Sequence, residues 1–160
     1  MATRLTSSDI PYRTSYLITQ TGANVAMTQA AKNMGSVADG RLMRPRAISW
    51  RVNTFAAVDP AAGGRILCRL FDRLSSDTGV RSLNNRQWDI CGVAASTSAV
   101  VIESGGVVHM DDNQLILGDY YSFYLSTTAL IAPISVSVAM YWDFVDVSEA
   151  DIVKLLYAAG

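Results

Sequence analysis

Hydrophobic and polar residues alternate with a period of two along most of this chain, whereas a helical period appears in only one or two places. In segment 46–58, Ile48, Trp50 and Val52 fall on one face of the expected strand, and Ser49 and Arg51 fall on the other. Such alternation is the pattern of a half-buried strand. The chain is therefore expected to be mostly β.

Seven or eight strands are expected, separated by short runs rich in Gly, Ser, Asn and Asp. Candidate strands lie at 12–21, 46–58, 65–73, 88–93, 99–103, 107–110, 120–126 and 134–145, and segment 114–117 is a further short candidate. Segment 25–32 suits either a strand or a short helix, because it is rich in Ala and Gln. Short strands at regular spacing are typical of a β-sandwich or barrel.

The period changes near the C-terminal end, where Ile152, Leu155 and Leu156 recur at helical spacing. Ser148 suits the N-cap position, and Asp151 three residues later completes a partial capping box. A short helix is therefore expected at 148–158. Its apolar stripe is expected either to cover the end of its own sandwich or to dock on a neighbouring subunit.

The chain has 160 residues, of which half are apolar and 17% are charged. This length suits one domain with a real core, divided into an N-terminal segment 1–40, a body 41–147 and a helical end 148–160. The N-terminal segment is expected to hold a strand and a loop, with an inter-subunit arm as an alternative. The mean hydropathy of +0.21 indicates apolar surface buried between subunits. No apolar run reaches the roughly 18 residues of a membrane span, and the polar start is unlike a signal peptide.

Charge is segregated along the chain although the formal net charge is only -1. Residues 41–86 carry nine Arg against three Asp, whereas residues 87–160 carry nine carboxylates against one Lys. Such asymmetry points to nucleic acid, an acidic partner, or head-to-tail packing of identical subunits.

Catalytic and metal-binding motifs are absent from the sequence. His109 is the single histidine, and Cys68 and Cys91 form no zinc pattern, so both cysteines are expected to be buried thiols. No glycine-rich phosphate loop and no nucleophile elbow occurs. Most of the large aromatic residues, among them Trp50, Trp88 and Trp142, are expected in the core or in an interface rather than stacked on bases. An enzyme is therefore not expected.

Asp111 and Asp112, followed by Asn113 and Gln114, offer oxygen ligands of the kind that calcium prefers. A complete calcium site needs about six to eight ligands, and Asp and Asn side chains commonly bond their own backbone in turns. We therefore expect a turn here and no cofactor, with calcium at a subunit junction as the alternative.

Four segments resemble the strands of small jelly-roll viral coat proteins, such as those of plant satellite viruses. Segment 44–52, Arg-Pro-Arg-Ala-Ile-Ser-Trp-Arg-Val, and segment 64–73, Gly-Arg-Ile-Leu-Cys-Arg-Leu-Phe-Asp-Arg, resemble the central strands, and 120–126 and 134–141 resemble the last two. The resemblance covers roughly the last two thirds of the chain. It depends on the residue pattern of the strands and on their order along the chain, and not on an invariant motif.

This resemblance implies an all-β, eight-stranded jelly-roll β-sandwich with a short C-terminal helix, acting as a structural capsid protein. Roughly sixty copies, or a multiple, would self-assemble into an icosahedral virion inside the host cell, without a membrane. The family usually starts with a strongly basic arm that neutralises RNA, whereas residues 1–40 carry only Arg4, Arg13 and Lys32. Packaging by an arm is therefore in doubt.

Arginines on the folded body would then contact viral nucleic acid, expected to be RNA, without reading its sequence. The candidate nucleic-acid-binding residues are Arg44, Arg46, Arg51, Arg65, Arg69 and Arg73. The same arginines suit ion pairs between subunits. The candidate subunit-interface residues are Arg81, Arg86, Asp143, Asp146, Ile152, Leu155 and Leu156.

Two other function classes remain open from the sequence. One is a trimeric β-sandwich head, tumour-necrosis-factor-like or viral-fibre-like, that binds a receptor or glycan. The other is an enzyme on a cupin-like scaffold, although the sequence lacks the histidine cluster of a cupin metal site.

Overall fold

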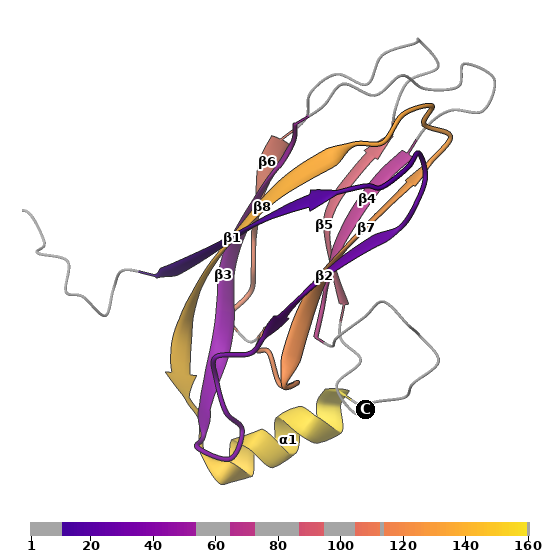
Figure 1. Ribbon diagram of the computed structural model, residues 1–160. Coiled ribbons are helices and arrows are strands. Elements are labelled where there is room, and N and C mark those ends of the chain that lie inside the picture. The colour runs from indigo at the N-terminus through magenta and orange to yellow at the C-terminus, as the bar shows by residue number, and fades with distance from the viewer. Residues whose placement is uncertain (1–10, 54–64, 73–86, 95–104, 113, 160) are drawn as a thin grey trace, which may run out of the picture.

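The computed structural model describes residues 11–53, 65–72, 87–94, 105–112 and 114–159. These residues form eight strands and one helix (Figure 1). In chain order the elements are β1 (Tyr12–Thr19), β2 (Met27–Lys32), β3 (Arg41–Val52), β4 (Arg65–Phe71), β5 (Gln87–Ala94), β6 (Gly105–His109), β7 (Tyr120–Thr128), β8 (Ser135–Asp146) and α1 (Glu149–Ala159).

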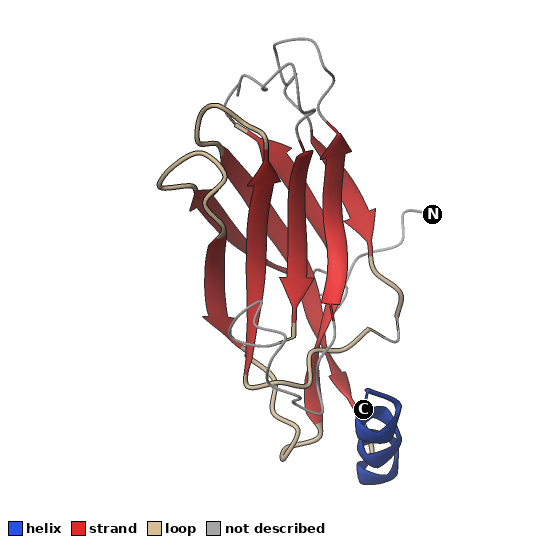
Figure 2. Cartoon of the chain, turned by 90° about the vertical axis from the view of Figure 1, so that its right-hand side faces the viewer, coloured by secondary structure: helices blue, strands red, loops and turns tan. Residues whose placement is uncertain are grey.

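The strands form two facing antiparallel sheets, in the orders β1-β8-β3-β6 and β2-β7-β4-β5 (Figures 1 and 2). The first strand pairs with the eighth, the second with the seventh, the third with the sixth and the fourth with the fifth. The chain is thus a long hairpin rolled up on itself, and the pairs β3–β8 and β4–β7 complete the sheets. This is the jelly-roll β-sandwich, so the predicted fold class is confirmed.

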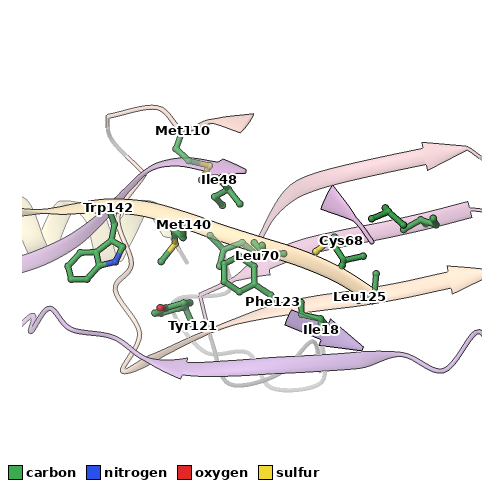
Figure 3. Close-up of a cluster of buried hydrophobic side chains, with 14 of the residues drawn as sticks. Ile18, Ile48, Cys68, Leu70, Met110, Tyr121, Phe123, Leu125, Met140 and Trp142 are labelled. Atoms are coloured by element: carbon green, nitrogen blue, oxygen red, sulfur yellow. The ribbon is translucent and has the colours of Figure 1, made fainter. Parts of the chain in front are cut away.

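The core lies between the two sheets and consists of the inward-facing members of the alternating patterns. Ile48 and Met140 from one sheet meet Leu70, Phe123 and Leu125 from the other, and all five are fully buried (Figure 3). Their removal from water is the main force that holds the sheets together.

Three strand predictions change in the structure. β3 begins at Arg41 rather than at residue 46, because 41–45 pairs with the end of β8 before a bulge at Arg46. The ambiguous segment 25–32 contains a strand, since β2 pairs along its whole length with β7. Segment 114–117 is not a strand and makes a single bridge, from Ile116 to Met43. The candidate strand 99–103 lies outside the described residues.

The described part of the N-terminal segment belongs to the sandwich. β1 forms an edge of one sheet, against β8, and β2 forms an edge of the other, against β7. Between residues 11 and 40, therefore, the chain contributes a strand to each sheet and is not an arm separate from the body.

Helix α1 covers the end of its own sandwich (Figure 1). Ser148 caps it as expected, because its hydroxyl accepts the Asp151 N–H at 3.3 Å and donates to the Asp151 carboxylate at 2.7 Å. Ile152 is buried, and Leu155 packs against a small cluster formed by Leu42, Leu115 and Leu117. Within one chain, Ile152 and Leu155 therefore cover the end of the sandwich, which is one of the two alternatives expected for this apolar stripe. Their contact with a neighbouring subunit stays a prediction. The Leu156 side chain lies outside the described part of the chain. No helix among the described residues is long and apolar enough to cross a membrane.

Candidate assembly and nucleic-acid surfaces

The predicted nucleic-acid arginines do not form one patch. Arg44, Arg46 and Arg51 lie on β3, whereas Arg65 and Arg69 lie on β4, and these strands belong to different sheets. Arg73 lies outside the described residues, as do the interface candidates Arg81 and Arg86. The cluster of arginines along the sequence is therefore divided between two faces of the molecule.

Arg44 is neutralised within its own chain by Asp143, which stands directly opposite it on β8. The guanidinium donates from Nε to Oδ1 at 2.9 Å and from Nη2 to Oδ2 at 2.8 Å. These hydrogen bonds raise the pKa of Arg44 above its ordinary value, although partial burial acts in the opposite direction. Arg44 and Asp143 are therefore partners of each other within the chain, and their predicted contacts with phosphate and with a neighbouring subunit stay predictions.

A second pair joins β3 to the turn that follows β6. Arg46, displaced outward by the bulge, donates to Asp112 Oδ1 at 2.8 Å. Next to it, the Gln114 N–H donates to the Asp111 carbonyl at 3.0 Å, and the Asp111 N–H donates to Gln114 Oε1 at 3.2 Å. The expected turn is present. No group of three or more His, Cys, Asp or Glu that could hold a metal occurs within the described residues.

The rolled hairpin explains how the separated charges meet. Residues 41–52 and 135–146 are far apart in sequence, but β3 and β8 are neighbours in one sheet. The basic middle of the chain therefore lies beside part of its acidic C-terminal half, and the two opposite charges compensate each other locally. Asp146, another interface candidate, is exposed and stands opposite Arg41.

The outer face of the β1-β8-β3 sheet holds a shallow depression of about 530 Å³. Its lining includes the small side chains of Ser15, Ser49, Ser137 and Ala139, together with Arg13 and Arg51. Arg13 lies over the Tyr141 ring at 5.9 Å from its centroid. Arg13 was not predicted as a site residue, although alternation along β1 places it on the same face as Ser15.

The outer face of the other sheet carries Arg65, which is exposed, and Arg69, which is half-buried. Arg69 stands between Tyr124 on β7 and Asp89 on β5 in the strand register. The inward positions of β4, Ile66, Cys68 and Leu70, are fully buried as the alternation predicts. Cys68 stands opposite Cys91 in the register.

A larger depression of about 1060 Å³ lies at the end of the sandwich, lined by residues 32–38 and 117–120. Two buried polar side chains fix its walls. Asp72 accepts the N–H groups of Leu117 at 2.9 Å and Gly118 at 2.8 Å, and Asn33 donates to the carbonyls of Ile116 and Gly118. Neither Asp72 nor Asn33 could be recognised from the sequence, because both bond backbone groups that are distant in sequence.

Large apolar side chains are also exposed on both sheets and at both ends of the sandwich. They are Tyr12, Leu17, Val25, Met34, Val107, Tyr120, Ile131, Val153 and Tyr157. The apolar excess of the composition is therefore visible on the surface of the isolated chain.

No protein family model matches this sequence, and no curated protein matches it at a significant level. Among solved structures, the chain is similar to VP1 of human polyomavirus 6, determined as a pentamer. That match has 7% sequence identity and a TM-score of 0.42, and it covers 92% of this chain and 99% of the VP1 chain.

Proposed function

We propose that this chain is a structural coat protein whose copies self-assemble into a small icosahedral shell around a viral genome. The observation that carries the proposal is the complete rolled hairpin of eight strands, the jelly roll on which many viral capsids are built. Because one fold serves several functions, the surface has to support the proposal as well.

Assembly would bury the apolar side chains that the isolated chain exposes. A closed shell needs complementary patches on a single surface, and exposed residues on both sheets and at both ends supply contacts in several directions. Two of the arginine-to-carboxylate pairs are already satisfied within the chain. Orientation between copies would therefore depend on charged groups such as Arg13 and Glu149, which pair with no described carboxylate or cation.

Nucleic acid, expected to be RNA, would be contacted without sequence readout by arginines on the folded body. With Arg44 and Arg46 engaged by carboxylates, the exposed Arg65 is the better candidate among those predicted. Contacts of this kind supply affinity that falls steeply with salt.

Negative-stain electron microscopy of the purified protein, with the ratio of absorbance at 260 and 280 nm, tests the proposal. Uniform spherical particles support a shell, and nucleic-acid absorbance in them supports packaging by the folded body. Discrete trimers under all assembly conditions would instead favour the receptor-binding or glycan-binding head.

A further inference from the structure

One end of the β1-β8-β3 sheet carries an aromatic cluster with an arginine beside it, formed by Tyr12, Trp142, Phe144 and Arg41. β3 and β8 have twelve residues each, against nine in β7 and seven in β4, so they extend beyond the facing sheet (Figure 1). Trp142 lies at the end of the row of core side chains (Figure 3). The cluster is therefore a continuation of the core face that the second sheet leaves partly open.

Tyr12 stacks on Trp142 with the ring centroids 4.7 Å apart and the planes inclined by 26°. Phe144 stands edge-on to both rings, at 5.8 Å from Tyr12 and 5.1 Å from Trp142. Trp142 is buried, and its indole N–H donates to Thr14 Oγ1 at 3.0 Å, so it forms a fixed support. Tyr12 is 54% exposed and presents aromatic surface to solvent.

Arg41 lies over the Phe144 ring, with its guanidinium carbon 4.0 Å from the ring centroid. Asp146 stands directly opposite Arg41 in the register, yet the two form no ion pair, and Arg41 pairs with no other described carboxylate. Arg44 and Arg46 on the same strand are both held by carboxylates. Arg41 therefore keeps its planar set of N–H donors available to an anion, on an aromatic support.

We propose that this cluster binds a nucleotide of single-stranded nucleic acid, with the base stacked on Tyr12 and the phosphate bound by Arg41. Tyr12 and Arg41 both lie against the Phe144 ring, so the guanidinium carbon of Arg41 is at most about 10 Å from the centroid of the Tyr12 ring. One nucleotide can bridge this distance between its base and its phosphate. Stacking on an aromatic side chain beside a cation is how proteins hold single strands without reading their sequence. The inference builds on the coat-protein proposal, since a coat protein must meet its genome, but binding can be measured apart from assembly.

The test is fluorescence anisotropy of the full-length chain, stripped of nucleic acid, with fluorescein-labelled oligo(U) and oligo(dT). Tyr12→Ala is expected to weaken binding about tenfold, the range of one lost base stack. Arg41→Gln is expected to weaken it severalfold and to reduce the slope of log affinity against log salt by about 1. Tyr12→Trp keeps a stacking surface and is expected to preserve affinity.

Tyr157→Ala is the matched control, because Tyr157 is 83% exposed but has no arginine over its ring among the described residues. Three results would each overturn the proposal: the unmodified chain binds no oligonucleotide, Tyr12→Ala binds with the affinity of the unmodified chain, or Tyr157→Ala loses as much affinity as Tyr12→Ala. So would a Tyr12→Ala variant that binds normally but forms no particles, because the cluster would then be a contact between copies. Binding that depends on Tyr12 in a chain that never assembles would support this site and count against the shell.

Discussion

Arg44 on β3 and Asp143 on β8 form a two-pronged ion pair although 99 residues separate them in sequence. Each side chain is about a quarter exposed, at 22% and 26%. The pair exists because the rolled hairpin makes β3 and β8 neighbours, and it shows that charge segregation along a chain need not produce charged faces.

Replacing Asp143 by Asn is expected to lower the free energy of unfolding by about 1–2 kcal/mol, because a partly buried guanidinium would lose charged hydrogen bonds. Urea denaturation measures this change. The exposed pair Arg46–Asp112 provides the comparison, and Asp112→Asn is expected to cost less than about 0.5 kcal/mol. Equal losses in the two variants would contradict the ranking by burial.

Tyr121 makes stability sensitive to alkaline pH. Its side chain is buried, and its hydroxyl shares a 2.8 Å hydrogen bond with Tyr16, so burial first and this bond second raise the pKa of Tyr121 above its ordinary value of 10.0. A phenol whose pKa is higher in the folded than in the unfolded state makes its full contribution to stability when the pH is below the unfolded-state pKa. This contribution is lost as the pH rises above the unfolded-state pKa towards the folded-state pKa.

We therefore expect the free energy of unfolding to decline above about pH 10, where unfolded Tyr121 ionises. Tyr121→Phe is expected to lose about 1 kcal/mol at neutral pH and to show a shallower alkaline decline. Urea titrations at several pH values measure both effects. Tyr157→Phe, at an exposed position, serves as the control and should retain the full decline.

Asp151 gives the first turn of α1 an acid sensitivity. The Ser148 hydroxyl first, and Lys154 at 3.0 Å second, hold the pKa of Asp151 below its ordinary value of 3.8. A carboxylate whose pKa is lowered in the folded state stabilises the fold when the pH is above its unfolded-state pKa. This stabilisation disappears as the pH falls through its folded-state pKa.

We expect the start of α1 to fray below about pH 4, which Cα chemical shifts of residues 148–152 would report. Asp151→Asn should remove this pH dependence. An unchanged helix start in the unmodified chain from pH 6 to pH 3 would contradict the capping account.

Asp72 and Gly118 are in close contact at the end of the sandwich. Asp72→Asn leaves one oxygen for the N–H groups of Leu117 and Gly118, so a buried donor loses its partner and stability is expected to fall by about 2 kcal/mol. A Cβ on Gly118 would lie 2.9 Å from Asp72 Oδ1 and 3.1 Å from the Asp72 carbonyl, so Gly118→Ala should also destabilise.

Gly22→Ala is the matched control for the contact between Asp72 and Gly118. The added Cβ would lie 3.4 Å from the Val25 side chain, an ordinary van der Waals distance. Urea midpoints that fall equally for the two glycine variants would contradict the account, because, of these two glycines, only Gly118 lies close to Asp72. The general effect of Gly→Ala on the entropy of the unfolded chain is stabilising.

Alternation alone located most strands, because a sheet face packed on a core imposes a period of two. Ile66, Cys68 and Leu70 follow the rule and are fully buried. The start of β3 breaks it, because the bulge at Arg46 shifts the inward face, and Leu42 and Met43 are buried in two different clusters. No simple period marks such a segment as a strand.

The surface was harder to predict than the fold. Which carboxylate meets Arg44 depends on strand order, and strand order depends on contacts made across the whole chain. The aromatic cluster was missed for the same reason: Tyr12 and Arg41 are each the first residue of a strand, and only β8 brings them together.

Sedimentation velocity of the purified full-length chain tests the central claim, self-assembly into a closed shell, most directly. A subunit of 17.3 kDa in a shell of sixty copies gives a protein mass of about 1 MDa, so a single fast boundary of that mass or a multiple is the expected result. A boundary at 17.3 kDa, or at three times that mass, under every salt and pH condition would contradict it.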